Sequence, residues 1–128
     1  MRSLIVATVL AMTASAAAAQ DFWGSYFTEI GIDDMYNSDG DPLYDICQMV
    51  QQDRANFHRF GITDPMDEGD PFFGTVEARQ IIPGICMVRE GYEYLRREVE
   101  NGNPRYVYVE VFGSGKRMTH VVINEGGG

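Results

Sequence analysis

Two segments near the C-terminus, residues 105–112 and 118–123, are rich in alternating apolar side chains and are separated by the turn-forming stretch 113–116. This pattern predicts a β-hairpin. Alternation places two sets of side chains on opposite faces of the first strand. One set is aliphatic: Val107, Val109 and Val111. The other is aromatic: Tyr106, Tyr108 and Phe112. One helical layer can bury only one face, so we expect helices to pack against the valines.

The aromatic face of this hairpin has two interpretations. If the aromatic N-terminal segment, residues 22–27, packs on it, its role is structural. If the face stays open, Tyr106, Tyr108, Phe112 and the nearby His120 form a candidate binding surface, because tyrosine suits amphipathic interfaces. The outer edge of the hairpin would then also be open to strand addition by a partner.

Residues 1–19 have the features of a secretory signal peptide. Arg2 supplies the positive start, residues 4–12 form an apolar core too short for a membrane span, and residues 14–19 are small up to an A-x-A cleavage site. We expect cleavage near Ala19 and a soluble periplasmic or secreted product with no membrane span. The rest of the chain is predicted to form one globular domain over residues 20–124, with a flexible tail over 125–128.

The chain is strongly acidic. Its formal net charge of −9 becomes −10 without residues 1–19, which contain one arginine and no acid. Nucleic acids and anionic membrane surfaces need a basic footprint, so this balance argues against both as partners. The negative charge instead favours a basic protein in the cell envelope as a partner.

Cys47 and Cys86 are the two cysteines of the chain. In an exported protein such a pair is expected to form a disulfide. There is no C-x-x-C pair, and neither cysteine has a histidine close in sequence that would activate it, so a redox or nucleophilic role is the weaker interpretation.

Helical spacing places both cysteines on predicted helices. The spacing of apolar residues predicts a long helix over 42–60, with Asp41 as N-cap and Pro42 in its first turn. A second long helix is predicted over 85–100 and a short one over 76–82, capped by Thr75 and ended by Pro83 and Gly84. The pattern of residues 22–30 favours a short helix, and a strand is the alternative. The predicted fold class is therefore α+β: two long helices linked by the disulfide, plus shorter helices, packed against the C-terminal hairpin.

Polar motifs with a possible chemical role are few. A loose calcium site at Asp39, Asp41 and Asp45 is one alternative, and a second would use Asp64, Asp67, Glu68 and Asp70. An EF-hand is excluded because Met35 and Ile46 occupy its first and last ligand positions. The sequence contains no nucleophile or phosphate-binding motif, and its two histidines lack ligand spacing. We therefore predict no catalytic residues and no cofactor.

In its broad features the chain looks like the small bacterial periplasmic accessory proteins, which include toxin-neutralising immunity proteins and acid-stress chaperones. The resemblance implies a non-catalytic protein that binds another protein, as an inhibitor, immunity protein or chaperone does. The alternative hypothesis is a small envelope enzyme or a calcium-dependent factor that uses the acidic loops.

Overall fold

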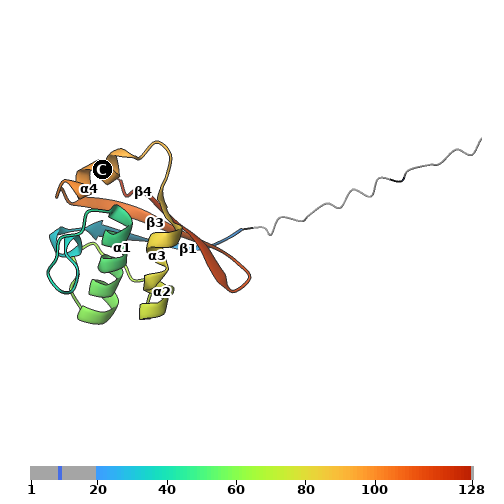
Figure 1. Ribbon diagram of the computed structural model, residues 1–128, viewed down its shortest axis with the longest axis horizontal. Helices are drawn as coiled ribbons and strands as arrows, with labels where there is room; N and C mark the ends of the chain where they lie inside the picture. The colour runs from blue at the N-terminus through green and yellow to red at the C-terminus, as the bar shows by residue number, and fades with distance from the viewer. Residues whose placement is uncertain (1–8, 10–19, 128) are drawn as a thin grey trace, which may run out of the picture.

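The alternating C-terminal segments form the predicted hairpin in a computed structural model that describes residues 9 and 20–127 (Figure 1). Its strands are β3 (Arg105–Ser114) and β4 (Arg117–Glu125). They belong to a four-stranded sheet of order β1-β3-β4-β2. The outer strands are β1 (Asp21–Ile30), antiparallel to β3, and β2 (Cys86–Val88), parallel to β4.

The favoured helix over residues 22–30 is wrong, because this segment is strand β1. Tyr26, Thr28 and Ile30 are buried, and the intervening Phe27 and Glu29 are only partly covered, which is the period of a strand. The aromatic and β-branched residues here favour a pleated surface once a partner strand is present. Gly24, with φ of 155°, lies at a register shift that re-aligns Phe22 with Phe112.

The first long helix begins later than the sequence predicts. Helix α1 spans Ile46–Ala55, and a π-helical turn, η2 (Asn56–Phe60), continues it to Gly61. Asp45, not Asp41, is the N-cap, and its side chain accepts hydrogen bonds from the N–H groups of Cys47 and Gln48. The backbone N–H of Asp41 instead donates to the Asn37 side chain at 2.9 Å, in a loop that follows the short 3-10 helix η1 (Ile32–Met35).

The predicted helix over 85–100 is wrong in its first half. Helix α3 (Ile82–Ile85) leads directly into strand β2, and α4 spans only Tyr94–Glu100. Gly91, with φ of 96°, interrupts a spacing that resembled one continuous helix. Before it, α2 (Val76–Gln80) is capped by Thr75 as predicted, but Pro83 lies in the first turn of α3 instead of ending a helix.

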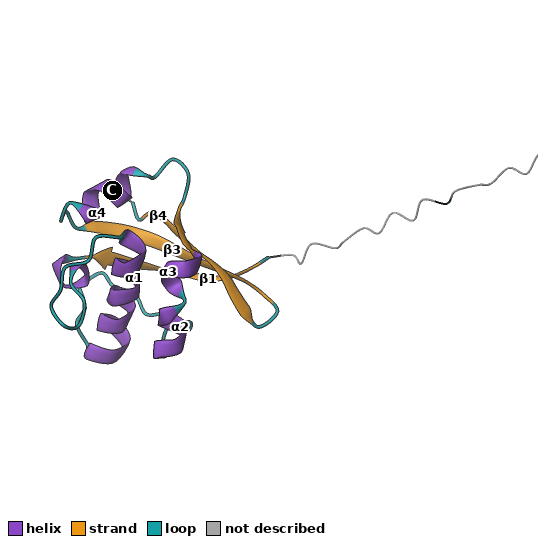
Figure 2. Ribbon diagram, viewed as in Figure 1, coloured by secondary structure: helices purple, strands orange, loops and turns teal. Residues whose placement is uncertain are grey.

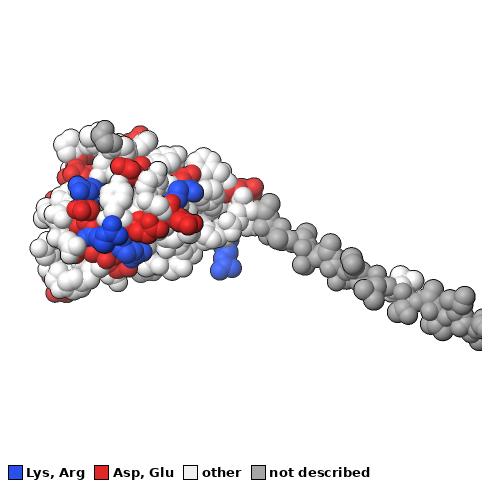
Figure 3. All heavy atoms as spheres, turned by 90° about the horizontal axis from the view of Figure 1, so that it is seen from above, with Lys and Arg blue, Asp and Glu red and all other residues white. Residues whose placement is uncertain are grey.

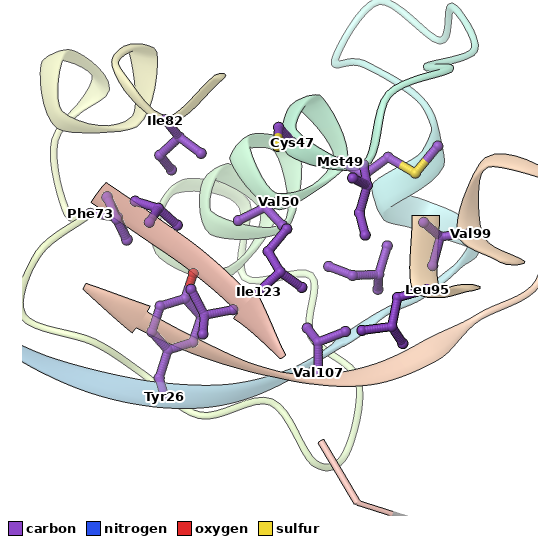
Figure 4. Packing of buried hydrophobic residues seen from close by; sticks show 14 of the residues in the cluster. Tyr26, Cys47, Met49, Val50, Phe73, Ile82, Leu95, Val99, Val107 and Ile123 are labelled. Carbon is purple, nitrogen blue, oxygen red and sulfur yellow. The ribbon is translucent and has the colours of Figure 1, made fainter. Parts of the chain in front are cut away.

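The hydrophobic core lies between one face of the sheet and the helices. Val107, Val109 and Val111 are fully buried, as the sequence predicts. Figure 4 shows Val107, Ile123 and Tyr26 directed from the strands toward α1 and its Val50. Leu95 and Val99 of α4 and Ile82 of α3 complete the same cluster. Figure 2 shows α1, α2 and α3 together on one side of the strands.

Two expected anchors of the connecting segments are present. Cys47 and Cys86 form the predicted disulfide, with their Cα atoms 5.8 Å apart. Because Cys86 is in β2, the bond joins α1 to a strand, not to a second helix. Phe73 is fully buried and Phe72 is partly buried, so the pair holds the loop after residue 64 against the core.

The structure describes the C-terminal end of the chain to residue 127 but little of the N-terminal end. The predicted signal peptide, residues 1–19, lies outside the described residues apart from residue 9. At the other end β4 reaches Glu125, one residue past the predicted domain boundary, and the N–H of Gly126 donates to the Tyr106 carbonyl at 3.0 Å. Within the described chain, no helix combines the length and apolar character needed to cross a bilayer.

We predict that the disulfide supplies a large part of the stability. The bond closes a loop between positions 39 residues apart, and restricting the unfolded chain over such a loop is worth about 4 kcal/mol. Chemical denaturation with and without a phosphine reductant measures this difference. A Cys47→Ser/Cys86→Ser variant should match the reduced protein, and an unchanged denaturation midpoint on reduction would contradict the prediction.

Candidate binding surface

The sheet face that points away from the helices carries five aromatic side chains, here called the aromatic face. They come from β1 and β3: Phe22, Phe27, Tyr106, Tyr108 and Phe112. Register pairs Phe22 with Phe112 and Phe27 with Tyr108. Ring centroids are 5.6 Å apart in the first pair and 4.8 Å apart in the second, and Phe27 also stacks on Tyr106 at 5.5 Å. These distances are those of favourable aromatic pairs.

The aromatic face is only partly shielded from solvent. Phe22 is 55% exposed, and the other four rings are half-buried, mainly by one another along the strands. The helices α1, α2 and α3 lie on the opposite side of the sheet (Figure 2). These three helices therefore leave the rings uncovered, whereas α4 approaches the Tyr106 end of the face, where Tyr94 and Leu95 line a hollow with Tyr106.

The face continues into a hollow of about 380 Å³ at the β2 side of the sheet. Its apolar walls come from Met87, Phe112 and Val122, and His120 lies beside them. Met87 is 46% exposed, and methionine adapts its shape to a partner. Within the described chain, the buried Nδ1 of His120 has no hydrogen-bond partner. Gln20, Arg89 and Glu90 complete the lining, so the hollow combines apolar walls with polar and charged side chains.

A polar group separates the hollow from the tyrosines. Arg89 pairs with Glu110 at 2.7 Å and also bonds the Asn124 side chain, whose amide donates to Glu110 at 2.8 Å. The space-filling view of the molecule likewise shows basic side chains flanked by acidic ones (Figure 3). The pairing of Glu110 neutralises the one charged residue that β3 places among its aromatic side chains.

The structure places the four predicted binding residues on one face of the sheet. Tyr106, Tyr108, Phe112 and His120 all lie on the face opposite α1, α2 and α3. Phe22 and Phe27 were missed as members, because a helix over 22–30 would have used them as a cover. As a strand, the segment places both rings beside those of β3 instead. Trp23 and Tyr26 point the other way, into the core cluster.

The expectation of an open hairpin edge is wrong. Strand β3 is paired along its outer side with β1, and β4 with β2. The edge strands of the sheet are instead β1 and the three-residue β2. Part of the β1 edge is occupied by the loop around Glu68. Phe27 donates its N–H to the Glu68 side chain, and Glu68 returns its own N–H to the Phe27 carbonyl, both at 2.9 Å. These two hydrogen bonds block the addition of another strand at Phe27.

A buried arginine holds this loop in place. Arg54 of α1 is fully buried and donates to the Glu68 carbonyl at 2.9 Å and to the Asp70 side chain at 2.8 Å. It also pairs with Asp53 at 2.8 Å, and its guanidinium lies 4.2 Å from the Tyr26 ring centroid. One side chain thus connects α1, β1 and the loop. Its charge is held in the interior by carboxylates, as a buried cation requires.

The same region contains more carboxylates than Arg54 can neutralise. Thr28 Oγ1 lies 2.9 Å from an Asp53 oxygen and 3.0 Å from an Asp67 oxygen, but its hydroxyl has one proton to donate. Asp34, also buried, accepts from the Gly31 N–H and the Asn56 amide. Burial nevertheless raises the pKa of Asp34 to about 6. Burial raises the pKa of Asp53 as well, against the effect of Arg54. The region therefore favours proton uptake in mild acid.

The alternative calcium sites gain no support from the structure. Asp39 and Asp41 are exposed in the loop before α1, whereas Asp45 caps the helix and pairs with Arg96 at 3.0 Å. Asp67 accepts hydrogen bonds from Thr28 and from the backbone of Glu29 and Asp64. Glu68 accepts from the Phe27 backbone, and Asp70 contacts Arg54 and His58. No group of three or more His, Cys, Asp or Glu side chains in residues 20–127 is placed to hold a metal ion.

Comparisons with known proteins add no relative, since no family model, no curated protein and no solved structure matches this chain.

We predict that the protein is more stable at pH 5 than at pH 7.5. The pKa of Asp34 is about 6 in the folded state and 3.8 without the fold, so as pH falls through 6 the folded state takes up a proton that the unfolded state does not. Stability therefore rises as pH falls, by about 1.4 kcal/mol between pH 7.5 and pH 5, because the full difference of about 3 kcal/mol is reached only below pH 3.8. Urea unfolding at both pH values measures it.

Asp34→Asn is the control for this pH effect, because it keeps the size of the side chain and removes the titration. The variant should show a smaller gain between pH 7.5 and pH 5. A wild-type protein that is equally or less stable at pH 5 would contradict the prediction, and an unchanged gain in Asp34→Asn would show that another group is responsible.

Proposed function

We propose that this protein is an exported, non-catalytic binding protein, and that its aromatic face docks a protein partner. The observation that carries the proposal is the group of five aromatic side chains on the sheet face opposite α1, α2 and α3, where Phe22 is exposed and the other four rings are half-buried. Contiguous exposed apolar surface in a small protein marks an interaction site more often than a structural one. Tyrosine and phenylalanine supply large contact area at little cost in side-chain entropy.

The partner's contact surface combines apolar and basic side chains. Apolar groups fit the rings and the hollow between Met87 and Phe112. Lysine or arginine groups fit the faces of Tyr106 and Tyr108, because aromatic rings attract cations. The formal net charge of −9 also favours a basic protein at long range. Inhibitors, immunity proteins and chaperones of the cell envelope are the classes of binding protein consistent with this proposal.

The proposed docking is face-to-face, not strand-to-strand. The middle of the β1 edge is occupied by Glu68 and Asp67, which bond to the backbone of Phe27 and Glu29. A partner strand would have to displace this loop together with its bonds to Arg54. The ring surface, in contrast, needs no rearrangement before contact. We therefore expect side chains of the aromatic face, and not the sheet edge, to supply the binding energy.

We predict that Tyr108→Ala weakens partner binding at least tenfold, as expected for an aromatic residue near the centre of an interface. The measurement is capture of partners from an envelope extract by the immobilised protein, followed by binding of the captured protein to each variant. Tyr44→Ala is the matched control, because Tyr44 is 74% exposed in the loop before α1, and it should bind like the wild type.

Three features of the result distinguish the proposal from simple unfolding. Tyr108 is half-buried, so its removal should cost only about 1 kcal/mol of stability in a denaturation curve. The captured protein should be basic, and its association should slow as salt rises. Equal capture by wild type and Tyr108→Ala, or a partner lost equally in Tyr44→Ala, would contradict the proposal.

A further inference from the structure

A second hollow, of about 330 Å³, lies on the helical layer between α1, α2 and the loop after Tyr36. Its lining is polar and rich in side-chain amides: Gln48, Gln51, Gln52 and Gln80. Two arginines, Arg59 and Arg79, also line it. The volume is at the lower end of the range for small-molecule sites. We call this feature the arginine hollow.

Arg79 is the unusual member of the arginine hollow. Its side chain is 6% exposed, yet within residues 20–127 it forms no ion pair. One of its five N–H donors is used, by the Phe73 carbonyl at 3.0 Å from Nη1. Arg54, the other buried arginine, pairs with two carboxylates. Burying a cation costs free energy unless a counter-charge is present, so Arg79 lacks the partner that Arg54 has.

The surroundings of Arg79 fit a bound anion better than a cation. Arg59 is exposed and, in the described chain, its guanidinium has no carboxylate partner and lies 4.9 Å from the Phe60 ring centroid. Asp39 is the one acidic residue that lines the hollow, and it is exposed in the loop. Amide groups of the glutamines add neutral donors. Two unpaired arginines beside one acid give this hollow a local positive charge on an acidic protein.

We infer that the arginine hollow binds a small molecule through an oxyanion, either a carboxylate or a phosphate group. The planar guanidinium of Arg79 matches both groups and can form two parallel hydrogen bonds with either. Arg59 adds a second charge from the solvent side, and the glutamines bond the rest of the ligand. This site lies on the helical layer and does not depend on the proposed function of the aromatic face.

The test is an NMR titration of the ¹⁵N-labelled protein with inorganic phosphate and, separately, with citrate at constant ionic strength. Saturable shifts of the Arg79 Nε–H and of the glutamine side-chain amides are expected with at least one of the two anions. A response to phosphate alone assigns a phosphate ligand, and a response to citrate alone assigns a carboxylate ligand. Absence of saturable shifts with both anions would overturn the inference.

Three variants make the result specific. Arg79→Gln should weaken binding about tenfold, the effect of losing one charge-assisted pair. Arg59→Gln, at an exposed position, should weaken it less and keeps the test available if Arg79→Gln does not fold. Arg97→Gln is the matched control, because Arg97 is exposed on α4 and lies outside the hollow. Equal affinity in wild type and Arg59→Gln, with Arg79→Gln unfolded or also unchanged, would overturn the inference.

Discussion

The packing of helices against one side of the sheet determines which side chains the other side exposes. Val107, Val109 and Val111 are fully buried under α1 and its neighbours, and burial of each such side chain contributes about 1.5–3 kcal/mol. Strict alternation along β3 then directs Tyr106, Tyr108 and Phe112 to the opposite face. Since β1 aligns Phe22 and Phe27 with the same face, the structure enlarges the aromatic surface instead of covering it.

Arg54 gives this sheet a protected edge. It connects α1 to the loop around Glu68, which in turn bonds the backbone of β1 next to the aromatic face. An unprotected edge strand invites pairing with other chains, and polar loops that cover it prevent this. The cost is a buried cluster of carboxylates around one guanidinium, which links stability to pH. The raised pKa of Asp34 comes chiefly from its own burial, with a smaller contribution from Asp67 and Asp64 of the loop that protects the edge.

The sequence predicts the parts of the fold whose signals are local. The hairpin, its two faces, the disulfide and the Thr75 cap follow from alternation, turn residues, cysteine number and capping chemistry. Residues 22–30 and 85–100 were mispredicted because their apolar spacing fits both a helix and a strand. Residues 22–30 form a strand because they pair with β3. In residues 85–100, Cys86 pairs with Val121 in the sheet and the positive φ of Gly91 interrupts the helix.

The candidate sites also divide into residues that local sequence patterns predict and residues that long-range contacts place. Tyr106, Tyr108 and Phe112 were predictable because alternation alone places them on one face. Phe22 and Phe27 join them only through tertiary pairing, and the isolation of buried Arg79 appears only when α2 packs beside α1. The role of Arg54 could not be predicted from the sequence either, because its partners Glu68 and Asp70 are 14 and 16 residues away along the chain. Long-range contacts of this kind leave no local sequence pattern.

Solvent accessibility, measured ring by ring, tests whether the aromatic face is open. A soluble paramagnetic agent broadens NMR signals of atoms it can approach, and aromatic C–H signals report each ring separately. An open face should give strong broadening for Phe22, Tyr106, Tyr108 and Phe112, with Tyr26 and Phe73 protected in the core. Protection of Tyr106, Tyr108 and Phe112 equal to that of Tyr26 in the purified protein would contradict it.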